Sequence, residues 1–98
     1  MVHTFDSKRE AEYYQTLTLR RAAGEIADLE LQKPYALMAH TYAGAAVIVG
    51  YYEADFVFVE LPARKQRIID VKGMKTQVYA LKKRIVEACW GIVIEEIR

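Results

Sequence analysis

The chain has 98 residues, 53% of them hydrophobic and 28% charged, which is typical of a globular protein and predicts one domain over residues 1–98. No apolar run approaches the roughly 20 residues that span a bilayer, and we expect no secretory signal at the amino terminus. A single cysteine, Cys89, excludes an internal disulfide or a cysteine-based zinc site, so we expect a reducing cytoplasm.

The net charge of +1 hides an uneven distribution. Residues 64–84 carry eight lysines and arginines against one acid, Asp70, whereas residues 1–63 carry five basic residues against nine acids. Such a segment is the electrostatic footprint of a protein that binds a phosphate backbone. A solvated helix face next to a basic turn gives the same pattern, so charge alone leaves both interpretations open.

The first predicted element is a helix over residues 8–23. Ser7 and Glu10 have the spacing of a capping box at its start, and Gly24 is a residue type that ends helices. The next segment, residues 28–32, alternates polar and apolar residues as a strand does, and Pro34 is expected to end it.

Residues 35–50 are ambiguous, with the pattern of a strand, a loop around Gly44 and a second strand. Residues 51–60 predict a strand, because they are rich in aromatic and β-branched residues. Its alternation puts one set of residues on one face, namely Tyr52, Ala54, Phe56 and Phe58. The opposite face then carries Glu53, Asp55, Val57 and Val59.

A turn at Pro62 leads to a strand over residues 66–73, and so short a connection predicts antiparallel pairing. Residues 76–90 predict a helix capped by Thr76, and residues 92–97 a last strand. The expected buried stripe of this helix is Val78, Leu81, Ile85 and Ala88 or Cys89. The fold class is therefore α+β, in αβββαβ order, with a central mixed sheet flanked by helices.

Three acidic residues occupy unusual positions: Glu10 in the first helix, Asp55 in an aromatic strand and Asp70 in the following strand. A carboxylate in the middle of a sheet costs several kcal/mol to desolvate unless a cation compensates its charge. Asp55 and Asp70, on neighbouring strands, would share Mg²⁺ or Mn²⁺, which prefer oxygen ligands. Lys72 lies two residues after Asp70 and so on the same face of the strand, beside the proposed metal.

Each of these residues also has a simpler interpretation. Asp70 and Lys72 would form a same-face ion pair worth less than about 1 kcal/mol. Asp55 would lie at an exposed edge of its strand, and Glu10 would serve only the capping box. Each signal alone is weak, whereas their joint occurrence around one sheet favours a metal site.

The pattern of Glu10, Asp55 and Asp70-Val71-Lys72 resembles the PD-(D/E)XK nuclease superfamily, whose core has the same αβββαβ order. The stretches FDSKREAEYY, GEIADLELQ, ADFVF and DVKGMKTQVYALKK are similar to small phage and prophage endonucleases related to archaeal-type Holliday junction resolvases. The resemblance spans almost the whole chain.

The resemblance implies a restriction-endonuclease-like fold and a Mg²⁺-dependent endodeoxyribonuclease, with Mn²⁺ as a substitute, in a bacterial cytoplasm and a phage or prophage setting. The metal-binding acids would be Glu10, Asp55 and Asp70, and the catalytic lysine would be Lys72. Gln32 and Gly73 would have supporting roles. The chain departs from the superfamily in having Ala54 where a proline is common, and aspartate where the third acid is more often glutamate.

The expected substrate is a four-way DNA junction, read by shape because the chain has no room for a recognition domain. Paired cuts need two active sites, so we expect a homodimer. Its candidate surfaces are Tyr13, Tyr14 and residues 42–52. The expected DNA contacts are Arg64, Lys65, Arg67, Lys75, Thr76, Lys82 and Lys83.

The alternatives are a nickase or flap endonuclease without junction preference, a non-catalytic DNA-binding module, and a protein-interaction domain with an ion-paired sheet. Cys89 is expected to pack within the second helix, and Trp90 is expected in the core rather than stacked on DNA.

Overall fold

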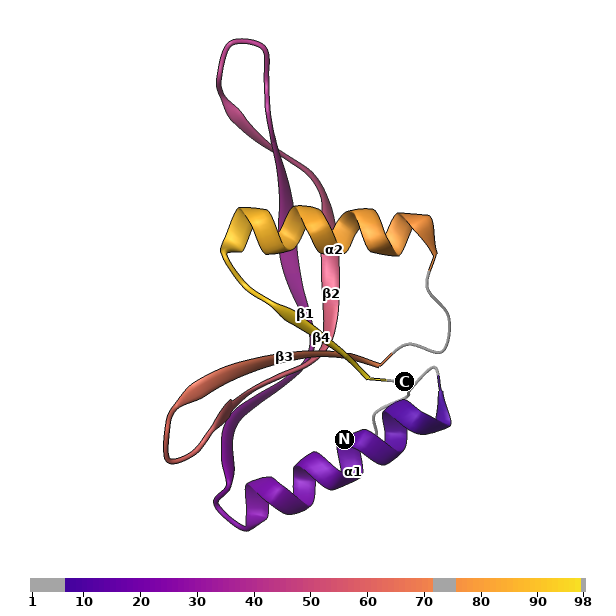
Figure 1. The fold of residues 1–98 in the computed structure, drawn as a ribbon, viewed down its shortest axis with the longest axis vertical. Coiled ribbons are helices and arrows are strands. Elements are labelled where there is room, and N and C mark those ends of the chain that lie inside the picture. Colours follow the sequence, from indigo (N-terminus) through magenta and orange to yellow (C-terminus); the bar gives the residue numbers. More distant parts are fainter. Residues whose placement is uncertain (1–6, 72–75, 98) are drawn as a thin grey trace.

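The computed structural model describes residues 7–71 and 76–97 of the chain and confirms the αβββαβ order (Figure 1). Its elements are α1 (Lys8–Ala22), β1 (Ile26–His40), β2 (Ala46–Glu60), β3 (Lys65–Val71), α2 (Gln77–Trp90) and β4 (Ile94–Ile97). The four strands form one sheet in the order β1-β2-β3-β4. The pairs β1–β2 and β2–β3 are antiparallel, as expected for the second, and β3–β4 is parallel, so the sheet is mixed.

Both helices begin and end at the expected signals. The Ser7 hydroxyl accepts a hydrogen bond from the Glu10 N–H, and the Thr76 hydroxyl accepts one from the Tyr79 N–H. After α1, Gly24 has a φ of 78°, and the chain closes in a Schellman motif. α2 ends at Gly91, which is also left-handed.

β1 does not end at Pro34, contrary to expectation, but continues to His40. Among the described strands it lies at the edge of the sheet and pairs with β2 alone. An edge strand tolerates proline because the missing N–H can face outward, where no ladder bond is needed. The sequence does not reveal that β1 is an edge strand.

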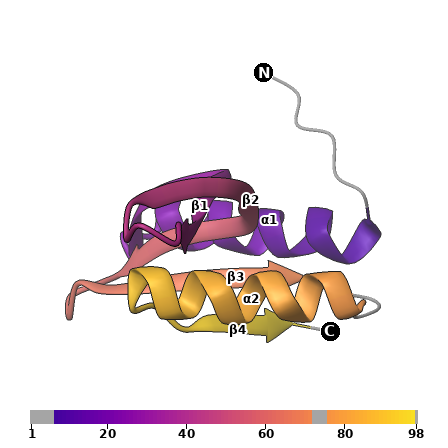
Figure 2. The same cartoon turned by 90° about the horizontal axis from the view of Figure 1, so that it is seen from above.

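Two hydrophobic clusters lie on opposite sides of the sheet, and α1 and α2 each cover one of them (Figures 1 and 2). The cluster under α2 contains Tyr52 and Ala54, whereas the cluster under α1 contains Phe56 and Phe58. The prediction that these four residues share one face is therefore wrong. A long two-stranded ribbon twists strongly, so residues two apart along β2 reach different clusters.

α2 is rotated from its predicted orientation. Its buried residue is Val86, and Tyr79 and Ile85 pack against the same cluster. Val78 and Leu81, expected in the core, are 66% and 57% exposed. Cys89 is exposed as well. Trp90 is half exposed, and its indole N–H donates to the Ala36 carbonyl at 2.9 Å, so it fastens α2 to β1 rather than filling the core.

The far part of the β1–β2 hairpin, residues 38–51, projects beyond α2, and we call it the arm (Figure 1). The radius of gyration is 15.1 Å and the longest dimension 50 Å. A compact domain of this length has a radius of gyration of about 13 Å, so the arm extends the molecule considerably. No helix in the described part of the chain is long and apolar enough to cross a membrane.

Candidate active site

Asp70 is the second-last residue of β3 and is completely buried. Its neighbours Ile69 and Val71 face the cluster under α1, so its carboxylate faces the opposite side, toward α2. There the Tyr52 hydroxyl donates a hydrogen bond to Asp70 Oδ2. The strand thus holds a carboxylate in the interior, oriented by a buried tyrosine.

Asp55 is the second of five consecutive buried residues, from Ala54 to Phe58, and is only 8% exposed. The alternative of an exposed strand edge is therefore wrong. The last β2–β3 pair at this end joins Phe56 to Ile69. Beyond that pair, the Val71 N–H donates to Asp55 Oδ2 at 2.7 Å, so the side chain continues the contact between the two strands.

Glu10 is 4% exposed, although it lies in the first turn of a helix. Its backbone N–H takes part in the cap, while its carboxylate accepts a hydrogen bond from Gln32 Nε2 at 2.9 Å. Gln32 has a φ of 53°, an unusual conformation for a residue within a strand. The cap therefore accounts only for the Glu10 backbone, and its carboxylate is directed toward β1.

The electrostatics of Asp55 reflect the two other acids. The pKa of its carboxyl group is raised to about 7, mainly by burial, although the hydrogen bond from the Val71 N–H lowers it. The charges of Asp70 and Glu10 and hydrogen bonding with Asp70 also contribute to this raised pKa. The three carboxyl groups, from α1, β2 and β3, thus influence one another within one region of the interior.

The sequence patterns did not identify two tyrosines, Tyr52 and Tyr79, that interact with acidic side chains in this region. Burial and the hydrogen bond to Asp70 raise the pKa of Tyr52, and burial and a hydrogen bond to Glu96 raise that of Tyr79. The rings of Tyr52 and Tyr79 lie 6.4 Å apart. The available signal was that a buried tyrosine hydroxyl needs a polar partner, but which partner depends on the twist of β2.

The predicted residues Lys72, Gly73 and Lys75 lie outside the described residues. Thr76 caps α2 and, with Lys82, lines a hollow of about 240 Å³ that also borders Tyr52. Thr76 and Lys82 therefore share a hollow with the tyrosine that contacts Asp70.

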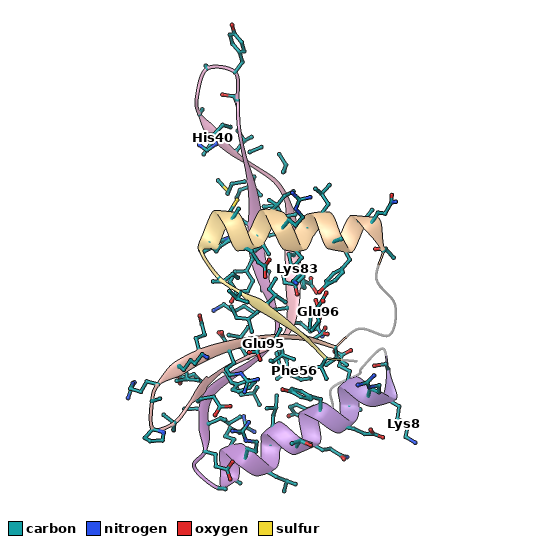
Figure 3. The ribbon with its side chains drawn as sticks, in the orientation of Figure 1. Lys8, His40, Phe56, Lys83, Glu95 and Glu96 are labelled. Atoms are coloured by element: carbon teal, nitrogen blue, oxygen red, sulfur yellow. The ribbon has the colours of Figure 1, made fainter. Side chains whose placement is uncertain are left out.

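Among the described residues, Lys83 is close to the acids, because its partner Glu96 pairs with Asp70 across β3 and β4, whereas the remaining predicted DNA contacts have other surroundings. The Arg67 guanidinium pairs with Glu95 at 2.6 Å and with Glu60 at 2.7 Å, in a network that Arg20 joins through Glu60. Lys83 lies 3.9 Å from Glu96, where α2 faces β4 (Figure 3). Arg64 and Lys65 lie at the opposite end of β3 from Asp70. The described residues of the basic segment are therefore divided over separate parts of the molecule.

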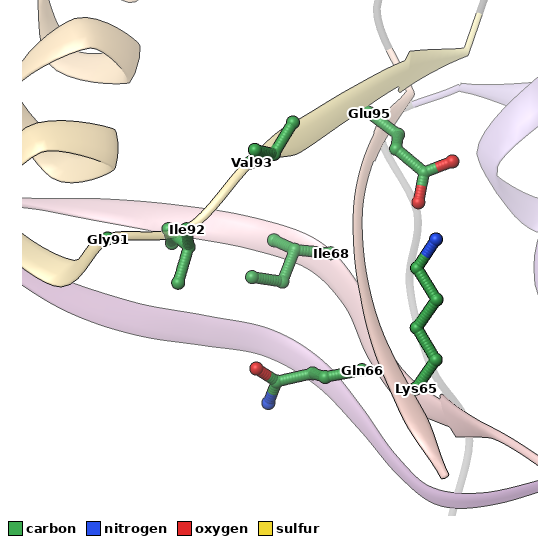
Figure 4. A pocket seen from close by; sticks show the side chains of 7 residues that line it. All are labelled: Lys65, Gln66, Ile68, Gly91, Ile92, Val93 and Glu95. Carbon is green, nitrogen blue, oxygen red and sulfur yellow. The ribbon is translucent and has the colours of Figure 1, made fainter. Parts of the chain in front are cut away.

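A larger pocket of about 450 Å³ lies between the start of β3 and the link from α2 to β4 (Figure 4). Ile68, Ile92 and Val93 supply apolar lining, and Lys65 and Glu95 supply charge. None of the three buried acids lines this pocket.

The donor set suits a hard cation, because it consists of carboxylate oxygens. Within residues 7–71 and 76–97, however, no three His, Cys, Asp or Glu side chains converge closely enough to form a ready-made ligand set. Mg²⁺ commonly uses only one or two carboxylates and retains several waters. Asp55 and Asp70 can fill that requirement, with Glu10 acting through water.

A family model described as "Protein of unknown function (DUF1064)" matches residues 2–94. The chain belongs to the DUF1064 family. The matched region includes α1, all three buried acids and the whole arm of this DUF1064 protein. Searches of curated proteins and of solved structures returned no significant match.

Proposed function

We propose that this DUF1064 protein is a metal-dependent endodeoxyribonuclease of the PD-(D/E)XK type that cuts branched DNA as a homodimer. The observation that carries the proposal is the set of three buried carboxylates, Glu10, Asp55 and Asp70, held by α1, β2 and β3. Burying acids that repel one another is costly, and a divalent cation would offset that cost. The element order and the residue pattern of the nuclease superfamily support the same function.

In this proposal Asp55 and Asp70 bind the metal and Glu10 binds it through water. The Tyr52 hydroxyl fixes the orientation of Asp70, and Gln32 fixes that of Glu10. Mg²⁺ or Mn²⁺, when bound, would supply an activated water and neutralise charge on the scissile phosphate. Lys72, which follows Val71 in the sequence, is the proposed catalytic lysine and would orient the attacking water.

The runner-up is a DNA-binding module without catalysis. Such a module depends on basic side chains that are available to phosphates. Two of the expected contacts, Arg67 and Lys83, lie beside acidic side chains of the same chain, which counts against strong phosphate binding whether or not the protein is catalytic. The buried acids have no role in that alternative, so the nuclease is favoured.

The test is cleavage of a labelled four-way junction and of a linear duplex of matching sequence, with Mg²⁺ or EDTA. We expect paired cuts in the junction that EDTA abolishes and that Asp70→Asn reduces at least about 10³-fold. The matched control is Asp28→Asn, which makes the same change at an exposed residue and should leave cleavage unchanged.

Equal cleavage of both substrates would retain the nuclease and remove the junction preference. Binding of the junction without any metal-dependent cleavage would refute the nuclease and leave the DNA-binding module.

A further inference from the structure

The arm combines three features that the nuclease proposal does not explain. Between Lys33 and Glu53 the sequence contains no Asp, Glu, Lys or Arg. Residues 46–49 and 51 are exposed, so the β2 side of the arm is uncovered on both faces. Val47, Ile48 and Val49 are consecutive β-branched residues with exposed fractions of 40%, 53% and 62%. A two-stranded hairpin is only marginally stable in water without a packing partner.

One edge of the arm is also open for pairing. β3 pairs with β2 only from Phe56 to Glu60, and no other described strand pairs with that edge of residues 46–52. Natural proteins protect such edges with charged residues, proline or bulges. The outer edge of β1 has Lys33 and Pro34, whereas residues 46–52 contain neither a charged residue nor a proline. The register shift between Leu37 and Met38 skips Val49, so the one irregularity of this edge is a bulge in β2.

We propose that two copies of this chain associate through their arms, with residues 46–52 of one β2 pairing antiparallel with residues 46–52 of the other around a twofold axis. The product is a continuous four-stranded sheet made of both arms. Antiparallel pairing of identical strands is self-complementary, as a twofold interface requires. The inference names the dimer interface and stands on the arm alone, so it does not depend on the proposed nuclease activity.

The chemistry of the arm favours a second copy over a nucleic acid. Phosphates are bound through Lys and Arg, and the arm has neither. Tyr42 is fully exposed and Tyr51 is 55% exposed. At the usual size of an aromatic side chain these two alone offer roughly 300 Å², toward the roughly 800 Å² that each partner buries in a stable dimer. The three β-branched residues add to that area.

A hollow of about 460 Å³ beside the arm offers further apolar surface. Met38, Ala46, Ala88 and Cys89 line it, together with His40. It lies between the arm and the carboxyl-terminal end of α2, so it would be partly covered when a second arm pairs with the first.

The test measures the molar mass of the metal-free, DNA-free protein by sedimentation over about 1–100 μM. We expect a monomer–dimer equilibrium that Ile48→Lys weakens at least about 30-fold, because the interface would have to bury unpaired ammonium groups. Leu19→Lys is the matched control, since Leu19 is 73% exposed on α1, and it should leave the equilibrium unchanged. Ile48 is exposed, so thermal unfolding of dilute Ile48→Lys should match that of the wild type.

Cross-linking identifies the geometry. Antiparallel pairing about a twofold axis puts one residue opposite its own copy, so single cysteines at residues 46–52, in a Cys89→Ser background, should cross-link strongly at one position. A cysteine replacing Leu19 should not.

A monomer at every concentration would refute the inference. A dimer that Leu19→Lys disrupts and Ile48→Lys does not would also refute it. A third refuting outcome is a monomer whose Ile48→Lys variant loses junction binding, because the arm would then bind DNA. All these measurements omit metal and cleavage, so their failure is distinct from failure of the proposed nuclease.

Discussion

β2 passes through two contrasting environments. From Ala54 to Phe58 every residue is buried, including the acid Asp55, whereas in the arm the apolar residues Val47, Ile48 and Val49 are exposed. The body thus buries charge and the arm exposes hydrophobic surface, each against the usual preference. Both arrangements reduce the stability of the isolated chain, and such departures are expected at sites that bind something.

The sharpest test of this contrast compares truncations at the two ends of β2. Phe56 is fully buried and its ring packs near those of Tyr13 and Tyr14, so Phe56→Ala should lower the free energy of unfolding by about 3–5 kcal/mol. Ile48→Ala should change it by less than about 0.5 kcal/mol in dilute protein. Urea unfolding of both variants measures the difference, and similar losses would mean that the arm is packed in solution.

A smaller effect is expected where Gln32 contacts Glu10. Residues that hold a metal ligand in place typically change metal affinity about 10–100-fold when they are replaced. Gln32→Ala should therefore weaken Mn²⁺ binding by that factor in calorimetry. Gln15→Ala, at an exposed position of α1, is the control. An unchanged Mn²⁺ affinity in Gln32→Ala would mean that Glu10 does not take part in the metal site.

The pH dependence of stability tests the burial of Asp55. Its pKa is raised to about 7 from an ordinary value of 3.8, so the folded state keeps a proton that the unfolded state loses. The contribution of Asp55 to stability is therefore complete below about pH 4 and is lost as the pH rises through about 7.

In EDTA at pH 8, Asp55→Asn should accordingly be more stable than the wild type by about 1–2 kcal/mol, with the advantage disappearing at acidic pH. Mg²⁺ should stabilise the wild type at pH 8 and have little effect on the variant. Chemical unfolding at two pH values measures this, and a variant less stable at pH 8 would contradict the assignment.

The smallest effect is expected at the base of the arm. Trp90→Phe removes the indole N–H that donates to Ala36 while retaining an aromatic ring near Tyr35. We expect a loss of about 0.5–1 kcal/mol in the free energy of unfolding. Tyr42→Phe, at a fully exposed position, should change nothing measurable in dilute protein.

The order of elements was predictable because turn residues and hydrophobic periodicity are local signals. Ser7, Gly24 and Gly91 mark helix ends whatever the tertiary structure. The errors arose where tertiary structure decides. Pro34 is tolerated only because β1 is an edge strand, and Val78 and Leu81 form as good an apolar stripe as the residues that α2 actually buries.

The candidate site was predictable to a similar extent. Alternation along β3 predicts that Asp70 points away from Ile69 and Val71, and the structure has that arrangement. The hydrogen bond from Tyr52 to Asp70 depends on the twist of β2. No local pattern specifies that twist.

The uncharged stretch between Lys33 and Glu53 has a practical consequence for ionic strength. Whatever docks on the arm is held without ion pairs, so moderate salt should leave that contact intact. Binding to a phosphate backbone, in contrast, weakens steeply with salt. Raising the salt concentration should thus release nucleic acid from the protein while preserving its assembly, and purification at high ionic strength would recover that assembly free of DNA.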